Sequence, residues 1–137
     1  MSVDWNAFTL GRDWQGFASD TSFVGHIPVG ISDDASLFKA VAKALRFPNY
    51  FGENWNALHD LLRDLSWIRQ RDVVLAHDEV PNIDSHSLGL YLEVLSESIR
   101  DWRDGENHRL IVYFPGKSIR DLQVRVASTF GPVTTRN

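Results

Sequence analysis

The chain has 137 residues, of which 43% are hydrophobic and 23% are charged, as expected of one folded domain with a buried core. Its formal net charge of −4 argues against binding to nucleic acid, which needs a basic surface. The absence of cysteine excludes disulfides, and no long apolar run or signal-like start is present, so we expect a cytoplasmic protein without a membrane span.

The N-terminal part predicts one short strand. Residues 1–22 mix aromatic residues with glycine and aspartate, and no element is assigned to them. The sequence FVGHI at residues 23–27 has the branched and aromatic character of a strand, which ends at Pro28.

A helix is predicted from the following segment up to Arg46. Residues 32–34, with the sequence SDD, can accept hydrogen bonds from the amides of a first helical turn. Apolar side chains then recur at helical spacing, at Leu37, Phe38, Val41 and Leu45. Pro48 prevents the helix from continuing.

A second helix is predicted after Asn54, which is a good N-cap residue. At about 100° per residue, one arc of this helix carries Trp55, Leu58, Leu61, Leu62 and Leu65. The opposite arc carries Asn56, Asp60, Arg63 and Asp64, with His59 on the flank. The helix therefore has a core face and a polar face that bears two carboxylates.

The second half of the chain predicts a strand, a long helix and another strand. The strands are residues 72–77 and 109–114, and the apolar run of the latter fits a central strand or one covered on both sides. The helix at residues 85–102 has an apolar stripe of Leu88, Tyr91, Leu92, Leu95, Ile99 and Trp102. Glu97 lies on its opposite side.

The tail from Pro115 fits two structures. Leu122, Val124 and Val126 alternate as in a strand, whereas Ile119, Leu122 and Val126 also suit a helix. The order of the other elements is strand, helix, helix, strand, helix, strand, which favours an α/β fold with a parallel sheet.

The motifs for catalysis, metals and phosphates are weak. His59 and Asp60 are neighbours on a helix and point about 100° apart, so they do not form an acid–base pair. His77 and Asp78 end a strand, where α/β active sites often lie, but no second motif supports them. The histidines lack metal-ligand spacing, and the single glycine of GENWNAL is not a phosphate loop. We therefore predict no enzyme and no cofactor.

A protein-binding face is the remaining possibility. Tyr50 and Phe51 lie in a loop before the helix that bears Asp60 and Asp64, and aromatic anchors beside carboxylates suit a basic pocket on a partner. Alternatively, both aromatic residues fill the core and the acids are merely solvated. Pattern alone favours this alternative.

The stretch LFKAVAKALRFPNYFGENWNALHDLLRDLSW, residues 37–67, resembles the barstar family of inhibitors of barnase and related ribonucleases. The family's loop and acidic helix are matched by Phe47, Pro48, Tyr50, Phe51, Gly52, Asn54, Trp55, Ala57 and Leu58. A weaker resemblance spans residues 23–114. It implies a three-stranded parallel sheet flanked by helices, with residues 1–22 and 115–137 as N- and C-terminal extensions.

The resemblance also implies an inhibitory surface. Tyr50 matches the loop aromatic that stacks at the nuclease site, and Asn54 matches the asparagine that closes the loop. Asp60 matches the carboxylate that enters the phosphate-binding pocket of the nuclease. Trp67 is matched to an aromatic after the helix, and Glu97 to an acidic contact on the last helix.

Two positions depart from the best-known inhibitor of the family. Asn56 stands where that inhibitor has an aspartate, and His59 where it has a tryptophan. The resemblance, together with the carboxylates Asp60 and Asp64, predicts a cytoplasmic immunity-type protein, a monomer when free, that blocks the active site of a basic ribonuclease. The departures leave open a binding module that keeps the fold but acts on a partner other than a ribonuclease.

Overall fold

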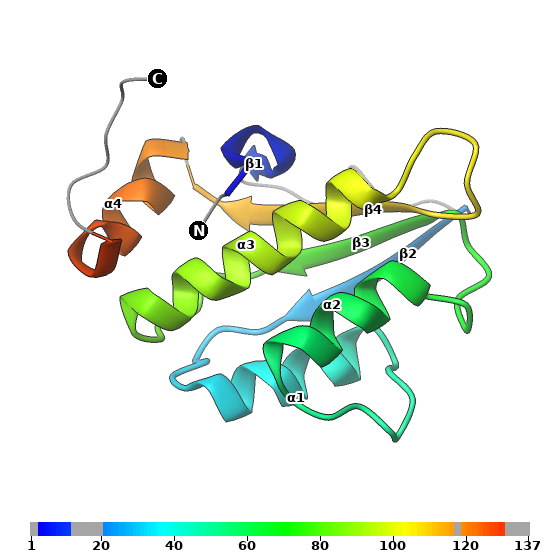
Figure 1. The fold of residues 1–137 in the computed structure, drawn as a ribbon, viewed down its shortest axis with the longest axis horizontal. Coiled ribbons are helices and arrows are strands. Elements are labelled where there is room, and N and C mark those ends of the chain that lie inside the picture. The colour runs from blue at the N-terminus through cyan, green and yellow to red at the C-terminus, as the bar shows by residue number, and fades with distance from the viewer. Residues whose placement is uncertain (1–2, 12–20, 117–118, 131–137) are drawn as a thin grey trace.

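The computed structural model describes residues 3–11, 21–116 and 119–130, the last segment with side chains only up to residue 126. The helices in these segments are the short 3₁₀ helix η1 (Trp5–Ala7), α1 (Asp34–Ala44), α2 (Trp55–Asp64), α3 (Ser85–Asp101) and α4 (Ile119–Phe130). The strands are β1 (Thr9–Gly11), β2 (Ser22–Ile27), β3 (Asp72–His77) and β4 (Arg109–Pro115). The chain is thus an α/β protein, as predicted (Figure 1).

The sheet is parallel throughout, with the strand order β1-β4-β3-β2. It has four strands, so the prediction of three strands is wrong. The additional strand is β1, which pairs with β4 in the register Thr9 to Tyr113. At three residues, β1 is too short to show an alternating pattern in the sequence. β4 lies between β1 and β3, so of the two alternatives that its apolar run allowed, the central position is observed.

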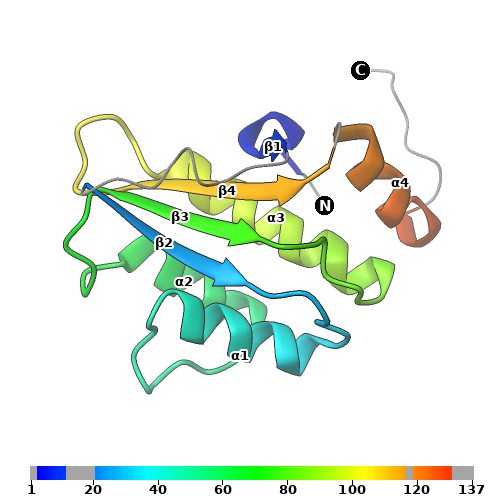
Figure 2. The same ribbon diagram turned by 180° about the vertical axis from the view of Figure 1, so that it is seen from behind.

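The two faces of the sheet are covered differently. Helices α2 and α3 lie in front of the sheet in Figure 1 and behind it in Figure 2. On this face, Val73 and Leu75 of β3 join Leu110 and Val112 of β4 in the main hydrophobic core. Alternate residues of the same strands point to the other face of the sheet. There Val74, Ala76 and Tyr113 form a second, smaller buried cluster.

Helix α1 packs close to β2 because of Gly25. A Cβ atom at this position would lie 2.5 Å from the carbonyl oxygen of Ala44, at the end of α1. The helix begins with a capping box in which Asp33 accepts a hydrogen bond from the backbone of Ser36. The predicted face of Leu37, Phe38, Val41 and Leu45 is buried.

The first described residues pack onto α3 and β4. The backbone N–H of Asp4 donates to the Ser96 hydroxyl of α3 over 3.2 Å. The ring of Phe8 meets Phe114 edge-on, with 5.5 Å between the ring centroids. The hydroxyl of Tyr113 donates to the carbonyl of Gly11, which holds β1 against β4.

The tail after Pro115 forms the helix α4, beyond the carboxyl ends of the strands (Figures 1 and 2). Leu122 and Val126 are buried, whereas Val124 is 65% exposed because it lies off the face that these two residues share. Of the two structures that the sequence allowed, the helix is therefore correct. No helix in the described segments has the length and hydrophobicity needed to cross a membrane.

Candidate protein-interaction site

The loop between α1 and α2 separates two neighbouring aromatic side chains. Phe51 packs edge-on against Phe47, with 5.0 Å between the ring centroids, and contacts Phe38 of α1. Tyr50, one residue earlier, is 69% exposed. The alternative in which both residues fill the core therefore applies to Phe51 alone, and Tyr50 is available to a partner.

Asn54 joins this loop to α2, as predicted for an N-cap. Its side-chain oxygen accepts from the backbone N–H of Ala57 over 2.8 Å. Its amide nitrogen donates to the carbonyl of Gly52 over 3.3 Å. The side chain of Asn54 thus fixes both the first turn of α2 and the last turn of the loop.

The exposed face of α2 carries a row of polar side chains, Asn56, Asp60 and Asp64, which we call the acidic row. All three are exposed, and the four-residue spacing places successive members about 6 Å apart along the helix. Within the described part of the chain, neither carboxylate has a hydrogen-bond or ion-pair partner. The opposite face buries Leu58, Leu61 and Leu62. Asp60 therefore points into solvent from a rigidly packed helix.

Ion pairs connect the flank of α2 that faces α3 to residues in and after α3. His59 Nε2 lies 3.1 Å from Asp101 Oδ2. Arg63 lies 3.0 Å from the Glu106 carboxylate, and its guanidinium covers the Trp102 ring at 4.1 Å from the centroid. These partners are about 40 residues away in the sequence, so the helical pattern of α2 gives no sign of them.

The contact of His59 is with a carboxylate of α3. A protonated His59 would meet the Asp101 carboxylate rather than present an unbalanced charge. Glu97 is four residues before Asp101 and so lies on the same side of α3, beside this flank. Glu97 is half-buried and has no ion-pair partner among the described residues.

The contacts of Glu106 with Arg103 and Arg63 lower the pKa of its carboxyl group. The pKa of the Glu106 carboxyl lies below its usual value because it accepts from the Arg103 backbone N–H and then from the Arg63 guanidinium. Glu106 therefore stays ionised, and the pair with Arg63 leaves little net charge on this flank.

Trp67 lies beyond the end of α2 and is half-buried. Its indole N–H donates to the carbonyl of Leu45 over 2.8 Å, and its ring packs edge-on against Phe47 at 5.8 Å. Trp67 thus supports the base of the loop that carries Tyr50. Its predicted contact with a partner stays a prediction.

The residues considered for catalysis do not form an active site. His59 contacts Asp101 and not Asp60. His77, which the sequence places at the end of a strand, is fully buried and contacts both the Tyr113 carbonyl and the Tyr91 hydroxyl. The described residues contain no cluster of three potential metal ligands.

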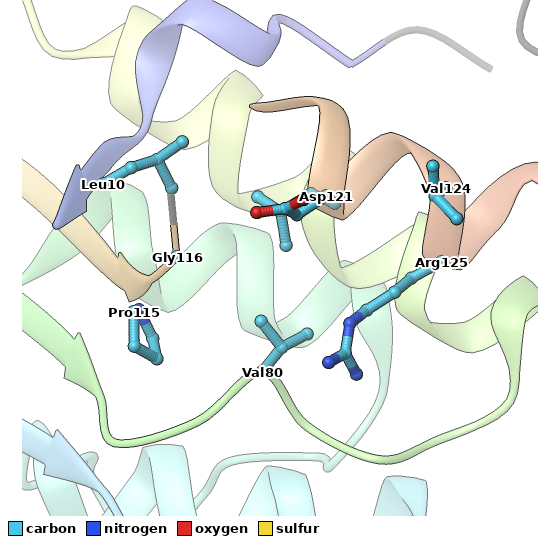
Figure 3. Close-up of a pocket in the computed structure, with 8 residues that line it drawn as sticks. Leu10, Val80, Pro115, Gly116, Asp121, Val124 and Arg125 are labelled. Carbon is cyan, nitrogen blue, oxygen red and sulfur yellow. The ribbon is translucent and has the colours of Figure 1, made fainter. Parts of the chain in front are cut away.

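A hollow of about 500 Å³ lies at the carboxyl ends of β1 and β4, below α4 (Figure 3). Apolar side chains form much of its lining, namely Leu10, Val80, Pro115, Leu122 and Val124. In Figure 3 the Arg125 side chain extends toward Val80. No residue of the predicted interaction site lines this hollow.

Comparison with known protein families gives one match. The family model described as "Barstar (barnase inhibitor)" matches residues 27–114, which is more than half of the chain. No curated protein matches the chain. The match contains the loop, α2 and α3, and therefore all residues of the predicted interaction site.

Proposed function

The chain belongs to the barstar family, and on that premise we propose that it inhibits a basic ribonuclease by covering the active site of that enzyme. The observation that carries this proposal is the acidic row, in which Asp60 and Asp64 are exposed and unpaired among the described residues. A nuclease cleft that holds RNA phosphate is lined with cations, and a carboxylate on a rigid helix can take the place of the phosphate.

The exposed loop supports the same proposal. Tyr50 is an aromatic anchor next to the acidic row, and interface hot spots are enriched in tyrosine. His59 lies on the flank of α2 that faces α3, and Glu97 lies on α3 beside this flank, where both would border the contact. Inhibition of this kind needs no turnover and no cofactor. We place it in the cytoplasm, and we retain residues 23–114 as the proposed inhibitory domain with two extensions.

The test is inhibition of purified barnase, followed by basic ribonucleases encoded by the same organism. Wild-type protein should inhibit at least one of them in a fluorogenic RNA-cleavage assay. Asp60→Ala should weaken the binding free energy by about 3–5 kcal/mol, which is the usual cost of removing one partner of a buried ion pair. That cost corresponds to a factor of about 10² to 10⁴.

Asp78→Ala is the matched control. It also removes one exposed carboxylate, but Asp78 contacts His26, which lies on the face of the sheet away from α2. The control should inhibit as wild type does. An inhibition constant that is the same for Asp60→Ala and wild type would remove Asp60 from the proposed role.

A second candidate is a binding module for a partner that is not a ribonuclease. It is favoured by Asn56, because a neutral side chain at this position gives α2 no carboxylate there to offer a basic cleft. The contact of His59 also occupies the Asp101 carboxylate of α3. Capture of interacting proteins from a lysate of the same organism distinguishes the two. A basic nuclease that is lost with Asp60→Ala supports inhibition, and an unrelated partner supports the module.

A further inference from the structure

Arginines from separate segments gather at the amino-terminal end of the sheet. Two adjoining hollows there have volumes of about 220 and 330 Å³. The smaller is lined by Phe23, Arg46, Trp67, Ile68, Arg69 and Gln70, and the larger by Thr21, Arg69, Gln70 and Arg71. Because they share Arg69 and Gln70, they form one continuous surface, which we call the arginine groove.

The groove has an excess of positive charge. Within residues 21–116, no carboxylate is among its lining residues. Arg69 has no hydrogen-bond or ion-pair partner in the described part of the chain, and the Arg46 guanidinium lies over the Phe23 ring at 5.3 Å from the centroid. Arg71 is 3.7 Å from the Asp72 carboxylate.

Among the described residues, the carboxylate that contacts an arginine of the groove is that of Asp72, and it is shared. Asp72 accepts two hydrogen bonds from Arg109, over 3.2 and 3.0 Å, which are shorter than its contact with Arg71. Asp72 can therefore balance one arginine, and the positive charge of Arg46, Arg69 and Arg71 remains largely uncompensated. The net charge of −4 averages over the surface and hides this region.

The lining suits a nucleotide chain better than an acidic peptide. Arginine binds phosphate with its planar fork, and aromatic side chains provide surfaces for bases. In the smaller hollow, Phe23 and Trp67 lie beside Arg46 and Arg69. An acidic peptide would use the arginines but would gain little from two aromatic side chains and a concave surface.

We propose that the arginine groove binds a short single-stranded segment of nucleic acid, with phosphates on Arg69 and Arg71 and a base in the hollow between Phe23 and Trp67. This site uses none of the acidic row and shares only Trp67 with the predicted interaction site. It revises the expectation, drawn from net charge alone, that the protein does not bind nucleic acid.

The affinity should be modest and strongly dependent on salt. Each phosphate contact to a single strand contributes a slope of about −0.7 to the plot of log K against log salt concentration. Two to three contacts therefore give a slope of about −1.4 to −2.1. Loss of two contacts should weaken binding about twentyfold at 0.1 M salt.

The experiment measures fluorescence anisotropy of labelled hexauridylate and hexathymidylate between 0.05 and 0.2 M salt, about the range over which such contacts respond. Wild-type protein is compared with the double variant Arg69→Gln/Arg71→Gln. The control is Arg100→Gln/Arg120→Gln, which makes the same charge change at exposed positions of α3 and α4. Asp60→Ala should retain binding, which separates this site from the inhibitory one.

The proposal is supported if either oligonucleotide binds in a salt-dependent manner and if this binding is lost in the groove variant but kept in the control. Comparison of the RNA and DNA oligonucleotides shows which sugar is preferred. The proposal is overturned if neither strand binds, or if both double variants lose the same affinity. An oligoglutamate peptide that competes at equal concentration would also overturn it, because the groove would then recognise charge alone.

Discussion

His77 shows how one residue at a suggestive position can be wholly structural. It ends β3, at the sheet edge where α/β sites often lie, yet its ring is stacked on Phe114 with 4.1 Å between the centroids. Since the Tyr113 carbonyl is an acceptor, Nδ1 donates to it over 2.9 Å, and Nε2 accepts from the Tyr91 hydroxyl over 2.7 Å. Both nitrogens are therefore satisfied in the neutral ring.

This environment predicts a loss of stability in mild acid. Burial lowers the pKa of His77 from 6.5 to about 3. Between these values the unfolded chain binds one more proton than the folded one, so the free energy of unfolding falls as the pH falls. From pH 6.5 to 4.5 this group should cost about 2 kcal/mol.

Urea unfolding at several pH values checks this prediction. His77→Gln should flatten the dependence on pH between 6.5 and 4.5, whereas His26→Gln, at an exposed position, should keep it. The ring signals of His77 in the NMR spectrum of the folded protein should not titrate above about pH 4. A His77 signal that titrates near pH 6.5 would contradict the assigned pKa.

At the residue scale, the sequence predicted which side chains of α2 are exposed better than it predicted their contacts. Exposure of Asn56, Asp60 and Asp64 follows from their position on the polar arc of a helix, which a 3.6-residue period reveals. The contact of His59 with Asp101 could not be predicted, because it depends on how α2 and α3 are placed in space.

At the scale of elements, the N-cap of α2 also holds the loop that presents Tyr50. Asn54→Ala removes the hydrogen bonds to Ala57 and Gly52 and should lower the free energy of unfolding by about 1 kcal/mol. Asn56→Ala, two residues on and exposed, should change it by less than about 0.5 kcal/mol.

Chemical denaturation measures both values, and inhibition assays on the same variants test the coupling to function. If the loop must be ordered before it contacts the nuclease, Asn54→Ala should also weaken inhibition. Equal stabilities of the two asparagine variants would show that the cap contributes nothing to the fold.

The predictability of an element depended on its length and on the clarity of its period. Helices α1, α2 and α3 each have ten or more residues and bury an apolar face, and all three were predicted close to their observed bounds. β1 was missed because three residues carry no period. The tail stayed ambiguous because Leu122 and Val126 fit both periods, and packing against α3 decides for the helix.

At the scale of the whole molecule, charge is distributed unevenly. The acidic row lies on the helical layer, and the arginine groove lies at the amino-terminal end of the sheet. A positively charged partner is therefore drawn toward one side of the molecule. This asymmetry could not be read from a net charge of −4.

The association rate with an inhibited basic ribonuclease should therefore fall at least tenfold as salt rises from about 0.05 to 0.5 M, because the attraction acts before contact and is screened. Stopped-flow fluorescence measures this rate. Asp60→Asn/Asp64→Asn should reduce the salt dependence while preserving side-chain volume. A rate that does not change with salt would mean that the acidic row does not steer the encounter.

The three residues of β1 cover part of the edge of β4. By pairing with β4, they occupy backbone groups that would otherwise form an open edge. Open edges recruit strands from other copies of a protein and lead to aggregation. The family match begins only at Ile27, so the cover over residues 113–115 of the β4 edge comes from a segment that family resemblance alone would treat as dispensable.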